Sequence, residues 1–168
     1  MASSKALLEL LQALWFILPA YVSNAAPVIF GGGFPLDLNR KWFDGRPILG
    51  KNKTVRGFFS GVVLGTLVGL LQFNLIGNPT PTASFLMSLG AMIGDCTGPF
   101  IKRRLGIESG RKAPLLDQYP FLMFAIIFTY LDTPLSLTKI AFLLLITPPI
   151  HLLTNKVAYL LGLKSCSW

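Results

Sequence analysis

The chain has 168 residues, a mean hydropathy of +0.61 and only 13% charged residues. A soluble domain normally carries about 25% charged residues, so the composition excludes an ordinary soluble domain and predicts an integral membrane protein. The formal net charge of +8 would suit a nucleic-acid-binding protein. We exclude nucleic acid as a partner, because the cations lie between apolar segments and no nucleic-acid-binding motif accompanies them. A single domain over residues 1–168 is expected.

Apolar segments recur along the chain, and each is close to the roughly 17–25 residues that a membrane-spanning helix needs. The pattern lacks the alternation of strands, so we predict an all-α membrane protein with five transmembrane helices. The start of the fourth segment is interrupted by Asp117, Gln118 and Pro120. The five segments are Ala6–Val22, Phe58–Ile76, Ala83–Ile101, Leu115–Leu131 and Thr138–Leu161.

The basic residues are distributed unevenly between the two ends of these segments. They concentrate in the connections after the first and third segments and in the tail, whereas the other side has only Lys5 and Lys139. By the positive-inside rule these long connections and the C-terminus are cytoplasmic, and the N-terminus is outside the cell membrane. The first connection, about Ser23 to Gly57, is long enough to be functional, and glycines and prolines fix its turns.

A basic stretch closes this first connection. Gly45 to Asn52 nearly matches the phosphate-loop pattern of nucleoside triphosphatases, but Asn52 replaces the hydroxyl and no strand precedes the loop, so that class is excluded. Lys53, Thr54 and Arg56 nevertheless lead into a helix, whose N-terminal N–H groups favour anions. We expect a phosphate-binding segment; contact with anionic lipid headgroups is the alternative.

Two acids of the same connection have two interpretations. Asp44-Gly45-Arg46 could open the pattern of CDP-alcohol phosphotransferases, but the later pair of acids on one helix is missing and that family is excluded. Asp37 and Asp44 either order the loop, as partners of Arg40 and Arg46, or contact a ligand.

Asp95 and Asp117 carry charge where charge is expensive, because each interrupts an apolar segment. A carboxylate at a helix centre costs roughly 2.5–3.5 kcal/mol on insertion scales and marks a functional site by default. Lys102 follows Asp95 by about two helical turns on the same face. Hard oxygen ligands beside a basic surface suit Mg²⁺ carrying a polyphosphate, so we predict that both acids bind this cofactor. The alternative is that each acid pairs with a Lys or Arg and only holds the helices together.

We expect packing roles for the remaining reactive side chains. His151 is isolated in an apolar helix and is expected to be a hydrogen-bonded packing residue. Cys96 and Cys166 show neither metal-site spacing nor a disulfide framework, and Cys96 is expected to pack between helices.

Several motifs resemble those of the archaeal CDP-archaeol synthase family, and the likeness extends over nearly the whole chain. They are Asn24 to Pro27, Gly31 to Asp37, Asp44 to Gly57, Gly94-Asp95, Phe100 to Ile107 and Ala113 to Gln118. The chain is more distantly similar to bacterial CDP-diacylglycerol synthases. It shares their Lys-Arg pair as Lys102-Arg103, although Gln118 stands where their later Asp-Arg motif has arginine.

The resemblance implies a Mg²⁺-dependent enzyme of archaeal phospholipid biosynthesis. It would transfer a cytidylyl group from CTP to an isoprenoid ether-lipid phosphate, 2,3-di-O-geranylgeranylglyceryl phosphate, and release pyrophosphate. The isoprenoid chains would stay among the membrane lipids and enter between helices lined by Phe59, Phe121 and Phe124. The sequence leaves open whether the chain forms a homodimer.

The resemblance and the charges together assign roles to individual residues. Asp95, Lys102 and Asp117 are the expected catalytic residues, with Asp95 and Asp117 on the metal. The expected nucleotide and phosphate ligands are Lys53, Thr54, Arg56, Lys102, Arg103 and Gln118. Arg46 and Arg104 would hold the lipid phosphate, and Asn24, Asp37 and Asp44, with Gln118, would shape the site or contact cytosine.

Two residues depart from the family pattern. Pro99 replaces a serine one turn from Asp95, and Phe34 stands where a small or polar residue is expected. We predict that Pro99 slows turnover. Two non-enzymatic hypotheses stay open: a carrier of an anionic solute, which needs a continuous polar path, and a structural protein that binds anionic lipid, which needs neither Asp95 nor Asp117.

Overall fold

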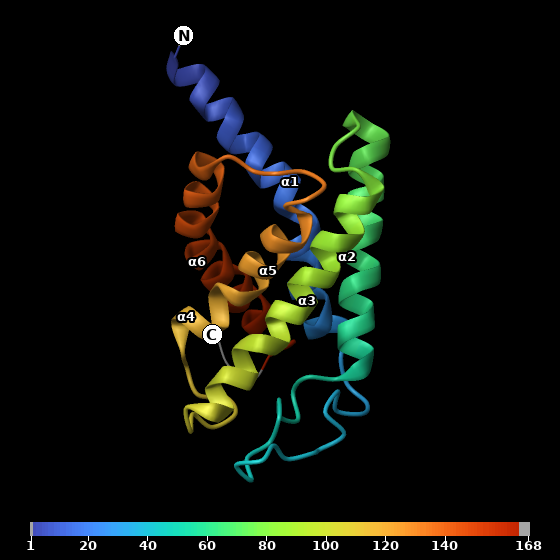
Figure 1. Cartoon of the computed structure of the whole chain (residues 1–168), viewed down its shortest axis with the longest axis vertical. Helices are drawn as coiled ribbons and strands as arrows, with labels where there is room; N and C mark the ends of the chain where they lie inside the picture. Colours follow the sequence, from blue (N-terminus) through green and yellow to red (C-terminus); the bar gives the residue numbers. More distant parts are fainter. Residues whose placement is uncertain (1, 165–168) are drawn as a thin grey trace.

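The structure, a computed structural model, describes residues 2–164, so Cys166 lies outside the described residues. The described chain is all-helical, as predicted, apart from two isolated β-bridges in the first loop. Figure 1 shows the helices as a bundle, with the loops after α1 and α3 gathered at one end. The helices are α1 (Ala2–Phe30), α2 (Val55–Ile76), α3 (Pro81–Arg104), α4 (Pro114–Gln118), α5 (Pro120–Thr129) and α6 (Leu137–Leu160).

Four of the described helices are long and apolar enough to cross a membrane. They are α1 from Ser4, α2, α3 and α6, whereas α5 is shorter. The predicted fourth segment is divided at Tyr119, because Pro120 has no N–H to continue the hydrogen-bond ladder. Together α4 and α5 still return the chain toward the end of the bundle where α1 begins (Figure 1).

The first helix is longer than predicted, and the first connection is correspondingly shorter. The helix continues through Pro19 and Pro27 to Phe30, so the connecting loop is residues 31–54 instead of Ser23 to Gly57. Helix-breaking residues are tolerated in membrane helices because neighbouring helices satisfy the freed backbone groups.

Glycines bring the helices close together. On α2, Gly57, Gly61, Gly65 and Gly69 form one buried stripe, and a Cβ added at Gly61 would lie 2.8 Å from the Ser23 carbonyl oxygen of α1. Small residues at such spacing let backbones approach in membranes. The opposite side of α2 exposes large apolar side chains: Phe59, Val63, Leu67 and Leu71. This face suits contact with lipid tails.

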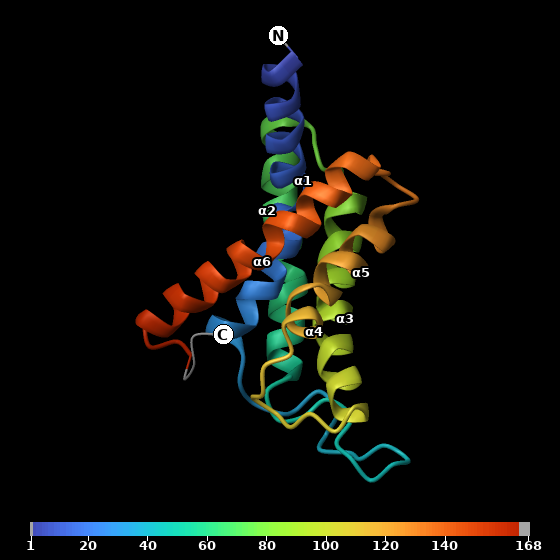
Figure 2. The ribbon, with the colours of Figure 1, turned by 90° about the vertical axis from the view of Figure 1, so that its left-hand side faces the viewer.

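The core is formed by α1, α3, α5 and one residue of α6. Phe16 and Ile17 of α1 meet Met87 of α3 and Phe121 of α5 there. Phe121 is 2% exposed, so it does not line a lipid entrance as predicted. Figure 2 shows that α6 crosses the bundle obliquely.

Candidate active site at the loop end of the helix bundle

The first loop is folded back on itself and presents Lys53 at the start of α2. Pro35 forms a β-bridge with Thr54, and the Leu36 N–H donates to the Lys53 carbonyl oxygen at 2.7 Å. Thr54 then begins the helix, because its hydroxyl oxygen accepts a hydrogen bond from the Gly57 N–H at 3.1 Å. The side chain of Lys53 is thereby directed toward α3.

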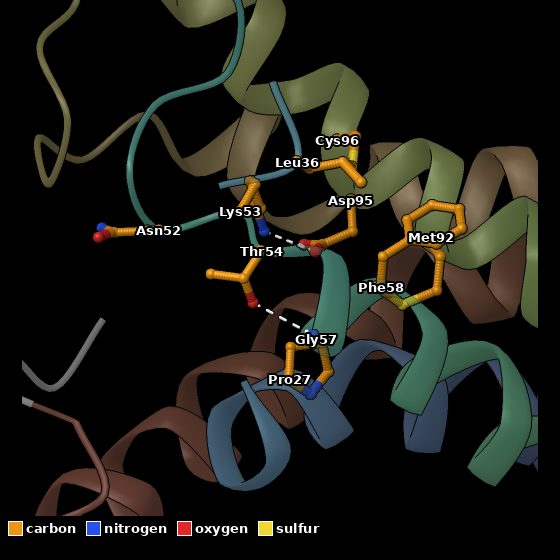
Figure 3. Close-up of a pocket in the computed structure, with 10 residues that line it drawn as sticks. All are labelled: Pro27, Leu36, Asn52, Lys53, Thr54, Gly57, Phe58, Met92, Asp95 and Cys96. Atoms are coloured by element: carbon orange, nitrogen blue, oxygen red, sulfur yellow. Dashed lines mark hydrogen bonds and ion pairs between the residues drawn. The ribbon is translucent and has the colours of Figure 1, made fainter. Parts of the chain in front are cut away.

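Lys53 pairs with Asp95 in the centre of this region (Figure 3). The distance from Lys53 Nζ to Asp95 Oδ2 is 2.5 Å, and the two side chains are 24% and 17% exposed. The pair borders a cavity of about 10 Å³ between the loop, α1, α2 and α3. That is room for about one water molecule, so a nucleotide can enter here only if Lys53 and the loop move.

Lys102 and Asp117 form a second ion pair, between α3 and α4. Lys102 is 6% exposed; its Nζ donates to Asp117 Oδ1 at 2.8 Å and to the Arg111 carbonyl oxygen at 2.5 Å. The other oxygen of Asp117 accepts from the Ala113 N–H at 2.9 Å. Gly98 of α3 permits this approach, since a Cβ there would overlap the Leu116 carbonyl oxygen of α4.

The sequence grouped Asp95 with Lys102, but the structure pairs each acid with a different lysine. The structure thus shows the lysine pairing of the structural alternative, and the metal role of both acids stays a prediction. In the described part of the chain, no group of three or more His, Cys, Asp or Glu side chains surrounds a potential metal position. Mg²⁺ is often bound by one or two carboxylates plus substrate phosphates. Asp95 and Asp117 supply carboxylate oxygens, the type of donor that such a cation takes, and their role as metal ligands stays a prediction.

The arginines of the region contact backbone carbonyl groups. Arg46 donates to the carbonyl oxygens of Arg103 and Arg104, at 3.1 and 2.8 Å, and so covers the C-terminal end of α3. Arg104 donates to Asp44 Oδ1 at 2.7 Å and to the Pro47 carbonyl oxygen at 2.5 Å. Asp44, Arg46 and Arg104 thus hold the tip of the first loop against the end of α3.

Two further predicted phosphate ligands make similar contacts. Arg56 donates to the carbonyl oxygen of Phe30, the last residue of α1, at 2.7 Å. Arg103 is 6% exposed and donates to the carbonyl oxygens of Leu49 and Ile107. Their guanidinium groups therefore already have protein partners, and their roles as substrate ligands stay predictions.

Asp37 orders the first loop from within. Its Oδ2 accepts hydrogen bonds from the N–H groups of Leu49 and Gly50, at 2.9 and 3.0 Å, and its Oδ1 accepts one from Asn39. Burial would raise the pKa of the Asp37 carboxyl, but the backbone N–H groups of Gly50, Leu49 and Asn39 together outweigh it and hold the pKa below its ordinary value. The loop-ordering interpretation thus holds for Asp37, with backbone partners in place of Arg40.

The other candidates lie around the same end of the bundle. Gln118 is 8% exposed and follows Asp117 on α4, and Asn24 lies on α1 one turn before Pro27, which lines the cavity. Sequence reasoning missed Leu36 and Met92 as lining residues, and apolar residues of this kind give no sequence signal of that role. It also treated Cys96 only as a packing residue, although Cys96 lines the cavity next to Asp95.

An apolar groove adjoins the small cavity. Its volume is about 270 Å³, and Leu36, Phe58 and Cys96 line both spaces. The remaining lining residues are Leu49, Ile93, Thr97 and Phe100. Charged groups and an apolar groove are thus adjacent at this end of the molecule.

The fold and the site define a multi-pass membrane protein with lysine–carboxylate pairs at the loop end of its bundle. Comparison with known proteins shows the family to which it belongs. Residues 6–168 match the family model of CarS-like CDP-archaeol synthases, so the chain belongs to that family.

The relatives match over almost their full length. The CDP-archaeol synthase of Pyrococcus horikoshii is 45% identical over 166 residues, which cover 95% of this chain and 98% of the relative. The synthase of Thermococcus gammatolerans is 48% identical over 169 residues, covering 97% and 99%. A solved structure, described as an intramembrane enzyme for archaeal membrane lipid biosynthesis, has a TM-score of 0.76 and 38% identity, covering 87% of this chain and 94% of that one.

Proposed function

We propose that this chain transfers a cytidylyl group from CTP to 2,3-di-O-geranylgeranylglyceryl phosphate, giving unsaturated CDP-archaeol and pyrophosphate. The observation that carries the proposal is the pair of lysine–carboxylate contacts, Lys53–Asp95 and Lys102–Asp117, at one end of an apolar bundle of this family. These are the charges that two anionic substrates require.

The reaction needs positioning more than it needs a base. A phosphate monoester is already an anionic nucleophile: one of its oxygens attacks the α-phosphorus of CTP, and the bond to the β-phosphate breaks to release pyrophosphate. The obstacle is the repulsion between two anions, so fixed positive charge lowers the barrier. Lys53 and Lys102 supply it, and both are held in position by the acids that neutralise them between turnovers.

Asp95 and Asp117 would hold Mg²⁺ together with the nucleotide phosphates. When bound, the metal would neutralise charge that develops on the phosphate oxygens during displacement. Substrate entry would then involve an exchange of partners: Lys53 would turn from Asp95 to the nucleotide phosphates, and the Asp95 carboxylate would be available to hold the metal. The small volume of the cavity supports such an exchange, because the paired state leaves no room for a nucleotide.

The lipid tails would lie in the apolar groove formed by Phe58, Ile93, Thr97 and Phe100. The groove supports this role because it adjoins the charged cavity, with which it shares the lining residues Leu36, Phe58 and Cys96. In the membrane, α4 and α5 would together form a fifth crossing, with the loop end of the bundle and the C-terminus in the cytoplasm. The excess of basic residues in the two loops supports this orientation.

The experiment is incubation of the purified chain with radiolabelled CTP, Mg²⁺ and the lipid phosphate. We expect labelled lipid from the unchanged chain and from Glu108→Gln, whose side chain is 79% exposed and belongs to neither pair. We expect an Asp95→Asn variant to form it about 10²- to 10³-fold more slowly. If neither the unchanged chain nor a Pro99→Ser variant forms labelled lipid, the enzymatic proposal fails.

A further inference from the structure

Three polar side chains lie on one face of α6. Thr147, His151 and Asn155 follow one another at every fourth position, which places them on one side of the helix. Thr147 is completely buried and Asn155 is 8% exposed. The Thr147 hydroxyl contacts the Tyr21 hydroxyl of α1 at 2.7 Å. This face of α6 is therefore turned into the protein and away from the surrounding membrane.

The hydrogen bonds of this face determine which nitrogen of His151 carries a proton. Lys164 Nζ donates to Asn155 Oδ1 at 2.9 Å. An ammonium group can only donate, so Asn155 presents its carbonyl oxygen to Lys164 and its NH₂ group to the imidazole. That NH₂ group lies 3.1 Å from His151 Nδ1, which must accept. A neutral imidazole that accepts at Nδ1 carries its proton on Nε2. His151 is thus prepared to donate a hydrogen bond from Nε2.

The ring lies against α5, which in turn packs on α3 at Gly94, the neighbour of Asp95. It stacks against Phe121 of α5, with ring centroids 6.4 Å apart and an angle of 26° between the planes. Phe121 is close to α3 beside Asp95, since a Cβ added at Gly94 would lie 2.7 Å from the Phe121 Cα. Within residues 2–164, the imidazole makes one hydrogen bond, at Nδ1. Its Nε2–H is therefore available for another acceptor.

We propose that His151 Nε2–H donates a hydrogen bond to a phosphate oxygen of a substrate bound between the two lysine–carboxylate pairs. The inference rests on the proposed function. Asp95 and Asp117 already accept hydrogen bonds from Lys53 and Lys102, and phosphate oxygens are the acceptors that the two substrates have in common. A neutral donor fixed by Asn155 adds direction without adding positive charge. CTP and the lipid phosphate both offer this acceptor.

The test compares His151→Phe with His151→Gln. Phenylalanine keeps the ring against Phe121 but has no donor, whereas the glutamine NH₂ group reaches about the position of Nε2 and can donate. For each variant we would measure the Kd for CTP with Mg²⁺ by titration calorimetry, the KM for the lipid phosphate, and the Tm. Tyr159→Phe is the matched control, since Tyr159 lies on the same helix and its side chain is 47% exposed.

We expect His151→Phe to weaken one substrate by about 10- to 100-fold, the effect of losing a hydrogen bond to a charged acceptor. His151→Gln should remain within a few-fold of the unchanged chain, as should Tyr159→Phe. A weaker Kd for CTP assigns the contact to the nucleotide, and a higher KM for the lipid assigns it to the lipid phosphate.

Two results would overturn the inference. One is unchanged binding of both substrates by His151→Phe; the other is equal loss in the Phe and Gln variants, which would mean that the imidazole matters for packing. If the unchanged chain forms no CDP-lipid, the proposed function fails separately, and the calorimetric Kd for CTP still decides whether His151 contacts the nucleotide phosphates.

Discussion

The Lys53–Asp95 pair offers a direct test of whether the acids serve chemistry or only hold helices together. Asp95→Asn keeps the shape of the side chain and one carbonyl oxygen that accepts from Lys53. The side chains are 24% and 17% exposed, between an exposed pair, worth roughly 0–1 kcal/mol, and a buried pair, whose disruption costs about 3–5 kcal/mol. We therefore expect Asp95→Asn to lower the free energy of unfolding by about 1–2 kcal/mol.

The loss of activity should be far larger than this loss of stability. Removing a fixed electrostatic group from an active site commonly lowers kcat by about 10²- to 10³-fold. The exchange variant, Lys53→Asp with Asp95→Lys, separates the two effects because it restores an ion pair with reversed ends. We expect its free energy of unfolding to lie within about 1 kcal/mol of the unchanged chain, while labelled CDP-lipid stays at the level of Asp95→Asn.

The assays are thermal or denaturant unfolding in detergent and the rate of CDP-lipid formation at saturating CTP. Glu108→Gln serves as control, because the pair that it breaks with Arg111 has side chains 74% and 79% exposed. A rate in the exchange variant close to that of the unchanged chain would show that Asp95 has only a structural role.

Three further predictions follow from the same geometry. Lys102→Met should lower the free energy of unfolding by about 2–4 kcal/mol, because Lys102 is 6% exposed and its loss leaves Asp117 without its ammonium partner; unfolding in detergent checks this, and a loss below about 0.5 kcal/mol contradicts it. Asp37→Asn should lower Tm at neutral pH; because the pKa of Asp37 in the folded state lies below its ordinary 3.8, its contribution is complete above that value and is lost as pH falls through the lower one. The Tm difference from the unchanged chain should therefore shrink on acidification, and a difference independent of pH would refute the assignment. Pro99→Ser should raise the rate of CDP-lipid formation, since serine restores an N–H for the Asp95 carbonyl oxygen and adds a hydroxyl one turn away; an unchanged rate rejects the idea that Pro99 slows the enzyme.

The low fraction of charged residues and the pattern of long apolar segments were enough to predict the class of the fold. Few charges and long apolar segments allow only helices to satisfy the backbone in a membrane, and the described chain is all-helical. The residues at which the helices begin and end were harder to predict. The first helix passes Pro27, which sequence rules treat as a stop, whereas Pro120 does interrupt the fourth segment. Tertiary contacts, which no local pattern contains, decide between these outcomes.

The pairing of the charges shows the same limit. Helical spacing placed Lys102 on the face of Asp95, but seven residues separate them by about 10.5 Å along the axis. The partner that Asp95 finds instead, Lys53, is 42 residues away and reaches it through the folded first loop. Sequence reasoning selected both acids and both lysines as site residues. It could not assign the pairs, because the pairs depend on the path of the loop.

The arginines that donate to backbone carbonyl groups limit which substitutions the protein can accept. Membrane insertion counts positive charge and treats lysine and arginine alike, so a lysine at Arg46, Arg56, Arg103 or Arg104 would leave the orientation of the chain intact. Arg104 uses two guanidinium nitrogens, one for Asp44 and one for the Pro47 carbonyl oxygen, and a single ammonium group cannot reproduce this forked contact between the end of α3 and the loop. Correctly inserted protein with loosened helix ends would result, and such a defect would escape any screen that scores only expression or topology.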